Sequence, residues 1–329
     1  MDVTMDHDYC TIPEPSSLDL AYAKIEELSN EVDELKKQLQ ELHVQRDFGL
    51  ERFAGSDEDI RFYTRLPSYR HLTSFWWLIE PSIHKIIRVS RAKSAARKQE
   101  DCHHQRRKTW HSFHMHPSTV SRIIATWTNY LYTLLGSVCV WLSAADVKSN
   151  LPEEFSDFPD TQVIIDCTEI RCQTPSSPLL QSEMYSNYKS HCTMKGLIGI
   201  APHGPVTFVS QLYAGSVSDR EIFKQCGITK MLTEDMAVMV DKGFLISDCV
   251  KCKVYCPPFL SRGKQMPAHQ VKETQAIARL RVHVERVIRT IKQNKLFDGV
   301  ITLSHSVNIN QLFSVACLLS NYQNKALVN

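Results

Sequence analysis

The sequence has no long uninterrupted apolar run. No window approaches the roughly 18 consecutive apolar residues that a membrane-spanning helix requires, so we expect no membrane segment. The N-terminal residues MDVTMDHDYC are polar and acidic, and they lack the apolar stretch of a secretory signal peptide. Because the eleven cysteines accompany no such signal, we expect them to be reduced thiols of an intracellular protein.

The chain also has little net charge and no paired zinc-ligand motif. A formal charge of +2 over 329 residues does not by itself indicate a nucleic-acid partner. The hydrophobic content of 43% and the charged content of 22% are ordinary for a soluble globular protein. Cys249, Cys252 and Cys256 have no fourth ligand nearby in the sequence, and the His-rich residues 102–116 lack paired spacing. Zinc binding is therefore the alternative that we set aside at both places.

A buried strand is predicted where residues 161–170 read TQVIIDCTEI. The short apolar run Val163-Ile164-Ile165 follows a turn-rich segment, and its β-branched content is typical of a strand buried on both faces. We expect this strand to end in Asp166, at the edge of a sheet where chemistry is often placed. The alternative is that Asp166 serves only as a turn residue or a helix cap.

Two further acids stand in comparable positions. Asp241 ends the apolar run 237–240 and precedes the turn signal Lys242-Gly243-Phe244. Glu285 lies in a helix predicted from Val271 to Leu296, beside an apolar stripe with helical spacing. On spacing alone, a surface network of Glu285 with Arg281 and Arg289 is the favoured interpretation.

Six motifs then suggest a family. In chain order they read VIIDCTEI, MYSNYKSHCTMKGLIGIAP, VTFVSQLYAGSVSDREI, VMVDKGF, YCPPFLSRGKQ and IARLRVHVERVIR. From about residue 62 onward, except near 88–112, the chain resembles the PIF/Harbinger-type DDE transposases and their host-domesticated relatives. This resemblance implies an α/β fold over residues 160–325, with an RNase H-like mixed sheet and flanking helices.

The resemblance also implies a reaction. Asp166, Asp241 and Glu285 match the catalytic, metal-binding acids of the family, and Asp219 matches a supporting acid in the GSVSD motif. Two Mg²⁺ or Mn²⁺ ions held by such acids would serve a DNA endonuclease that hydrolyses phosphodiesters and performs strand transfer, because hard cations prefer carboxylate oxygens. Strand alternation turns Glu169 away from Asp166, so we rank Glu169 below the triad.

DNA contacts are expected on two helices. In HPSTVSR, a helix beginning at Pro117 would bury Val120, Ile123, Ile124 and Trp127 and would offer a major groove the polar residues Ser118, Thr119, Ser121 and Arg122. An ordinary helix start with capping hydroxyls is the alternative. On the helix that carries Glu285, the basic residues Arg281 and Arg289 would hold phosphates.

Residues 60–145 are expected to be helical, as a partial helix-turn-helix. Within them, residues 88–112 are polar and basic where the family has apolar helices, which puts sequence-specific DNA reading in doubt. This stretch would bind phosphate or act as a nuclear import signal, or it would simply be disordered and solvated. We therefore predict a nuclear location, with the cytoplasm as alternative, and a separate partner protein that reads DNA, as happens in this family.

The N-terminal part is predicted to be disordered over residues 1–17 and a coiled coil over 18–47. The apolar positions alternate spacings of three and four, at Leu18, Ala21, Ile25, Leu28, Val32, Leu35, Leu39 and Leu42. We expect a homodimer through residues 18–42, whereas a lone helix packed on its own domain is the alternative. The intact acids favour a nuclease, and the altered 88–112 stretch favours a non-catalytic, domesticated nuclear protein that dimerises or binds chromatin.

Overall fold

The computed structural model describes residues 16–48, 54–87, 116–137, 140–258, 266–303 and 308–323. The predicted disorder at 1–15 and the basic stretch at 88–112 lie outside the described residues. The chain divides into two compact units, Met1–Ser56 and Asp57–Asn329. The larger unit contains both the segment predicted as helical and the segment predicted as the endonuclease.

In the first unit, one helix of 32 residues, α1 (Ser17–Phe48), contains the predicted heptads. Its start is capped reciprocally, because Ser16 donates its backbone N–H to Asp19 and Asp19 donates its own to Ser16 Oγ. The helix therefore includes Ser17, which was predicted to be disordered. The leucine, isoleucine and valine side chains of the heptad are 47% to 64% exposed.

The second unit is built on a mixed sheet of order β2-β3-β1-β6-β7, in which β4 and β5 also pair with β3. The strands are β1 (Thr161–Arg171), β2 (Tyr185–Ser186), β3 (His191–Ile200), β4 (Val206–Val209), β5 (Tyr213–Ala214), β6 (Ala237–Met239) and β7 (Lys253–Tyr255). Strand β1 is antiparallel to β3 and parallel to β6. The mixed sheet with flanking helices confirms the predicted α/β, RNase H-like fold class.

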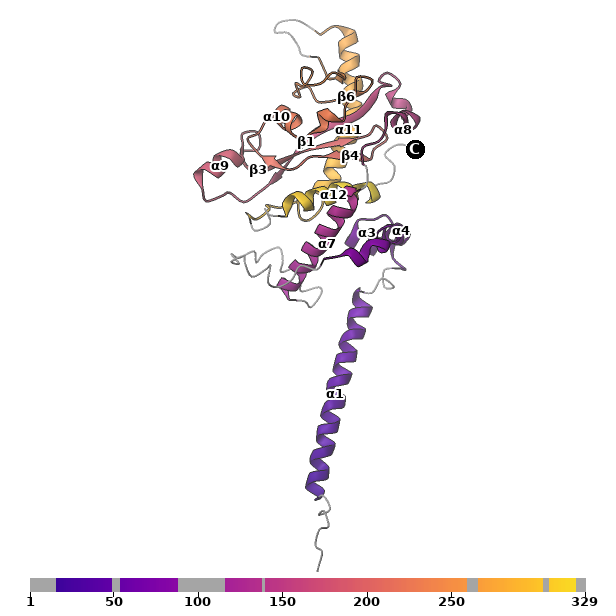
Figure 1. The fold of residues 1–329 in the computed structure, drawn as a ribbon, viewed down its shortest axis with the longest axis vertical. Coiled ribbons are helices and arrows are strands. Elements are labelled where there is room, and N and C mark those ends of the chain that lie inside the picture. The colour runs from indigo at the N-terminus through magenta and orange to yellow at the C-terminus, as the bar shows by residue number, and fades with distance from the viewer. Residues whose placement is uncertain are drawn as a thin grey trace, which may run out of the picture. The chain divides into compact units, whose positions relative to one another are not determined.

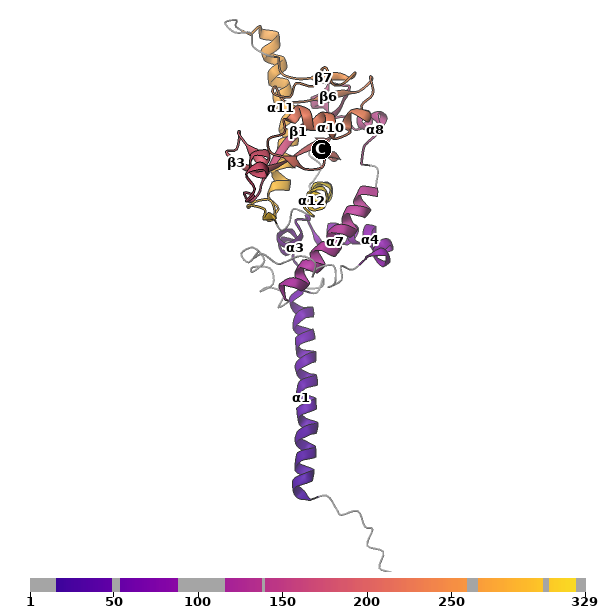
Figure 2. The same ribbon diagram turned by 60° about the vertical axis from the view of Figure 1, so that its left-hand side comes forward.

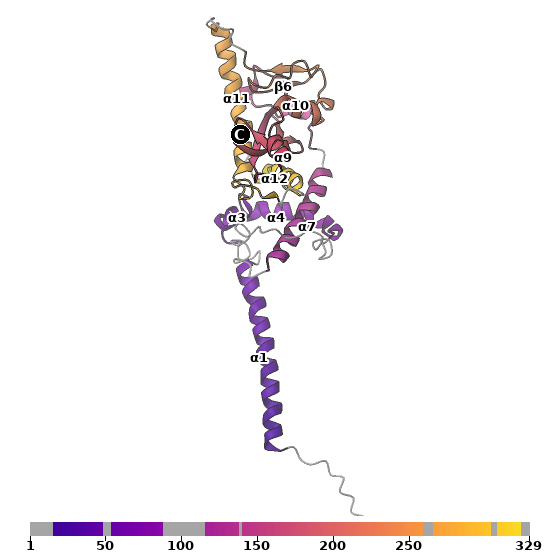
Figure 3. The same cartoon turned by 90° about the vertical axis from the view of Figure 1, so that its left-hand side faces the viewer.

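Helices cover both faces of this sheet. The helices described in the second unit are α3 (Asp57–Thr64), α4 (Tyr69–Ile79), α7 (Pro117–Ser137), α8 (Ala144–Ser149), α9 (Pro178–Met184), α10 (Asp219–Gln225), α11 (Ala268–Lys292) and α12 (Ile309–Gln323), with short 3-10 turns at η1 (Glu80–Lys85), η2 (Glu153–Phe155) and η3 (Ile228–Lys230). Apolar side chains of α11 and α12 pack with one face of the sheet, and those of α10 pack with the other. Figure 3 shows α11 and α10 on opposite sides of β6.

The predicted end of β1 at Asp166 is wrong. The strand continues to Arg171 because β3 pairs with it as far as Arg171↔Thr193, with Asp166 opposite Ile198. The parallel partner β6 stops earlier, at Ile164↔Met239. Asp166 therefore lies inside a strand but just beyond the end of its neighbour, where one side of the ladder is open.

Helix α11 begins three residues before its predicted start and ends before Leu296. All six residues of the predicted apolar stripe are buried, namely Ile277, Leu280, Val284, Val287, Ile288 and Ile291. Their packing against β1 fixes which edge of α11 faces the open end of β6. Figure 1 shows α11 lying along the sheet.

Helix α7 packs against α12, as Figure 2 also shows, and its buried residues differ from those predicted. Thr126, Thr128 and Tyr130 are buried, whereas Ile123 and Ile124 are 41% and 49% exposed. At Tyr130 the helix also contacts the end of α4, because the Tyr130 hydroxyl donates to the Ile79 carbonyl at 2.7 Å. Within the described residues, no helix combines the length and the apolar character needed to cross a bilayer.

Candidate active site

The strand register brings two of the predicted acids together. Because Ile164 of β1 pairs with Met239 of β6, two further residues along each parallel strand lead to Asp166 and Asp241. Asp241 also opens the turn after β6, since its carbonyl accepts the Phe244 N–H at 2.9 Å. The aspartates thus leave neighbouring strands at the same level, a placement that open α/β sheets use for ligands.

The third acid approaches from α11. Its neighbour one turn earlier, Arg281, is 9% exposed at its side chain and lies between all three carboxylates. Arg281 Nη1 is 2.7 Å from Asp241 Oδ1, and Nη2 is 3.9 Å from Asp166 Oδ2 and 3.8 Å from Glu285 Oε1. Asp166, Asp241 and Glu285, far apart in sequence, therefore converge on one guanidinium.

The cluster is open on one side and closed on the other. The side chains of Asp241 and Glu285 are 52% and 56% exposed, whereas that of Asp166 is 26% exposed. Burial raises the pKa of Asp166 to about 6; the Arg281 charge and the Cys167 N–H oppose this, and the Asp241 and Glu285 charges add to it. One cation thus leaves the inner carboxylate incompletely compensated.

The donors suit a hard divalent cation, although Arg281 stands between them. Three carboxylates are the ligands that Mg²⁺ and Mn²⁺ prefer, and the raised Asp166 pKa marks a place where more positive charge would be favourable. In the described parts of the chain, no group of three or more His, Cys, Asp or Glu side chains is arranged to hold a metal ion. At this cluster the Arg281 guanidinium occupies the position between the three carboxylates. The carboxylate oxygens are therefore suitable ligands for a divalent cation, and such an ion would meet the Arg281 guanidinium between them.

Asp219, the predicted supporting ligand, lies in a different group. At the start of α10, its carboxylate is 3.2 Å from Lys195 Nζ, which is also 3.7 Å from Glu169. Glu169 in addition accepts a hydrogen bond of 2.8 Å from the Thr193 hydroxyl. Glu169 is three residues from Asp166 on β1, so strand alternation places it on the other face. The structure therefore brings Asp219 to Lys195 and Glu169, and it shows no contact of Asp219 with the described side chains of the three acids.

The predicted DNA-reading side chains of α7 are largely engaged within their own helix. Arg122 donates to the Ser118 carbonyl at 3.2 Å and to the Thr119 hydroxyl at 3.1 Å. Ser118 Oγ is 2.8 Å from His116 Nδ1. Ser121 is half-buried. Such local bonds are common at a helix start, and the contact of these side chains with a major groove stays a prediction.

The two arginines predicted to hold phosphate differ. Arg281 is buried among carboxylates, which a phosphate would have to replace. Arg289, two turns further along α11, is exposed. Of the pair, Arg289 is therefore the one placed at the surface.

The predicted site omitted Lys292, at the end of α11. Burial and the Lys189 charge lower the pKa of Lys292, and the charges of Glu169 and Asp166 oppose that shift. Lys292 stands seven residues after Glu285, so two helical turns bring both to the same face. The seven-residue spacing from Glu285 is the sequence signal that would have placed the Lys292 side chain near the acids.

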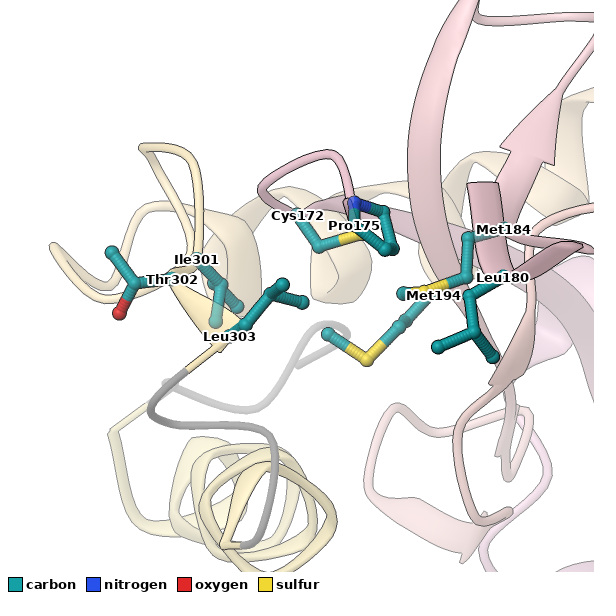
Figure 4. Close-up of a pocket in the computed structure, with 8 residues that line it drawn as sticks. All are labelled: Cys172, Pro175, Leu180, Met184, Met194, Ile301, Thr302 and Leu303. Atoms are coloured by element: carbon teal, nitrogen blue, oxygen red, sulfur yellow. The ribbon is translucent and has the colours of Figure 1, made fainter. Parts of the chain in front are cut away.

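A cavity in the described residues is separate from these acids. It measures about 330 Å³, and Figure 4 shows the side chains around it: Cys172, Pro175, Leu180, Met184, Met194, Ile301, Thr302 and Leu303. Its lining is almost wholly apolar and includes no acid. The three acids of the candidate site therefore lie outside this cavity.

Residues 165–321 match the family model described as DDE superfamily endonuclease. Comparison of the chain with curated proteins and with solved structures gave no match. The matched segment contains Asp166, Asp241 and Glu285 together with Arg281. Residues 165–321 are therefore similar to the DDE superfamily endonucleases, over the strands and the helix that bring those acids together.

Proposed function

We propose that the protein is a divalent-metal-dependent DNA endonuclease of the DDE transposase type, which hydrolyses phosphodiesters and performs strand transfer. The observation that carries this proposal is the convergence of Asp166, Asp241 and Glu285 within the segment that matches the endonuclease family. A strand, a strand end and a helix from distant parts of the sequence supply them. A surface network confined to α11 would include only Glu285 and its neighbours.

In this proposal the three acids hold Mg²⁺ or Mn²⁺, which supplies an activated water and an electrophile for the phosphoryl oxygens. The rest depends on the chain's own groups. The β1–β3 ladder fixes the backbone of Asp166, and its carboxylate accepts the Cys167 N–H at 2.9 Å. The exposed Asp241 and Glu285 leave an open side for a DNA strand. Lys292 and Arg289, on the same helix, bind backbone phosphates beside the acids.

The finer assignment to the PIF/Harbinger type is supported by the six ordered motifs. Because the polar side chains at the start of α7 are bonded within that helix, sequence reading is assigned to a separate DNA-binding partner. The exposed apolar stripe of α1 is assigned to a homodimer, since more than three heptads of such positions bury their area best against a second copy. Because the proposed substrate is DNA, we propose a nuclear location, with the cytoplasm as the alternative.

A second candidate function is a catalytically inactive, domesticated nuclear protein that dimerises or binds chromatin. The observation that favours it is the Arg281 guanidinium among the acids, because an ion pair can preserve such a cluster as structure alone. Both candidate functions include a dimer formed through the apolar stripe of α1. They differ in whether the protein cleaves DNA.

The test is nicking of supercoiled plasmid with Mn²⁺ by the full chain, Asp166→Ala and Glu285→Ala. Glu234→Ala is the matched control, because Glu234 is 77% exposed and paired at 3.9 Å with the equally exposed Lys251. We expect nicking by the full chain and by the control, with a loss of at least about 100-fold in both site variants. Equal nicking by all four proteins would show that Asp166 and Glu285 are not catalytic. If none of the four nicks the plasmid, the inactive candidate is favoured.

A further inference from the structure

Arg281 takes the place that a cation would take among three carboxylates. It reaches them from α11, whose buried apolar stripe leaves its backbone little freedom to move. One of its nitrogens contacts Asp241, and the other lies nearly equidistant from Asp166 and Glu285. The position is therefore central to the three acids rather than specific to one of them.

The hydrogen bonding of this guanidinium is incomplete. An arginine has five N–H donors, but among the described residues the structure gives Arg281 one hydrogen bond, to Asp241 at 2.7 Å. Its Nε is buried with no hydrogen-bond partner in the described structure. The separations of 3.8 and 3.9 Å to Glu285 and Asp166 exceed hydrogen-bond length. A buried donor without a partner is costly, so the resting position is held mainly by charge.

A divalent ion and this guanidinium compete for the same oxygens. A metal shared by the three acids needs its ligands at about 2.0–2.2 Å, so an ion in the centre would stand within contact distance of Arg281. Two cations so close repel strongly where water is partly excluded. The more than half-exposed side chains of Asp241 and Glu285 leave an opening through which the long arginine side chain can turn outward.

We propose that Arg281 is the resident cation of the acidic site: it holds the three carboxylates together before metal arrives, and a divalent ion binds only by displacing it. Arg281 thereby sets the metal concentration at which the site forms. This inference rests on the proposed metal-dependent function. It makes Arg281 a positioning residue that acts through the acids, and it explains why these carboxylates are collected around a guanidinium and yet are not spaced for a metal.

The test is Mn²⁺ affinity, measured by isothermal titration calorimetry on the full chain and on Arg281→Gln, Arg281→Lys and Arg279→Gln. Arg279 is the matched control, because it is exposed on the same helix and its substitution removes the same charge. We expect Arg281→Gln to bind Mn²⁺ about 30-fold more tightly, which is the change for removing a unit charge about 4 Å from a divalent ion at the weak, water-like limit. Arg281→Lys should be intermediate, because it keeps the charge but presents one compact donor group.

A second readout separates displacement from a general structural role. Without divalent ions, the melting temperature of Arg281→Gln should fall below that of the full chain, because the acids lose their cation, and Mn²⁺ should raise it by more than it raises that of the full chain. A merely structural arginine would weaken metal binding when removed. Unchanged or weaker Mn²⁺ binding by both Arg281 variants overturns this inference and leaves the proposed function standing. Absence of Mn²⁺ binding from all four proteins overturns the proposed function, and the inference with it.

Discussion

The raised pKa of Asp166 leads to a prediction about stability and pH. In the folded chain this carboxyl titrates at about 6 instead of 3.8, mainly because it is buried. Folding therefore favours its protonated form, and ionisation costs the folded state free energy. As pH rises from below about 4 to above about 6, the unfolding free energy loses a contribution of roughly 3 kcal/mol, from about two pKa units at about 1.4 kcal/mol each.

Asp166→Asn removes this titration and keeps the shape, including an oxygen that can accept the Cys167 N–H, at 2.9 Å in the parent. We expect the unfolding free energy of the variant, minus that of the full chain, to rise by about 2.4 kcal/mol between pH 4 and pH 7. Urea unfolding in EDTA measures it, followed by tryptophan fluorescence, because Trp141 packs against a core cluster of the sheet. Carboxyls remote from Asp166 cancel in the difference, because they are present in both proteins and have no interaction with the substituted group.

Asp235→Asn is the control with the opposite sign. A hydrogen bond from the Thr233 hydroxyl lowers the pKa of Asp235, so its carboxylate stabilises the fold above its unfolded pKa and loses that contribution as pH falls. The stability of this variant relative to the full chain should therefore decrease as pH rises. A difference for Asp166→Asn that stays constant from pH 4 to pH 7, or that falls, would refute the argument that burial dominates at Asp166.

Further predictions concern the dimer, the DNA contacts and a tight turn. Leu35→Glu should halve the mass measured by sedimentation, because it places a charge in the apolar stripe of α1. A mass equal to that of the parent would contradict the proposed dimer. Lys292→Gln and Arg289→Gln should each weaken binding to non-specific duplex DNA and reduce its salt slope by about 1, and an unchanged slope would exclude that phosphate contact. Gly215→Ala should destabilise the fold by roughly 2 kcal/mol or more in urea unfolding, because a Cβ there would lie 2.3 Å from Thr193 Oγ1; a neutral result would show that the loop can shift.

Local patterns in the sequence predicted the frame of the site well. The run Val163–Ile165 indicated a buried strand, and the apolar stripe beside Glu285 indicated the buried face of α11; both sets are buried in the structure. These inferences succeed because each depends only on the spacing of nearby apolar residues. A helix buried on one face and a strand buried on both faces each require a characteristic spacing. The fold class followed from them and from the resemblance.

Features that depend on distant partners were not predictable in this way. Nothing between residues 161 and 170 shows that β3 will extend β1 past Asp166. Helical spacing places Arg281 beside Glu285 on a surface, and only the arrival of two aspartates from the sheet turns its guanidinium inward. The buried face of α7 was chosen by hydrophobicity, yet Thr126 and Thr128 are buried in the structure and Ile123 is exposed.

Strand β1 has a consequence for how the chain can vary. Alternate residues send Asp166 to the Arg281 side and Glu169 to the Lys195 side, so two networks of charge lie back to back across a single strand. An insertion or deletion of one residue before Asp166 would exchange the two sides completely, carrying Cys167 toward the arginine. Single-residue changes in the length of strand β1 are therefore not tolerated. Such changes must come in pairs of residues, or the flanking loops must absorb them.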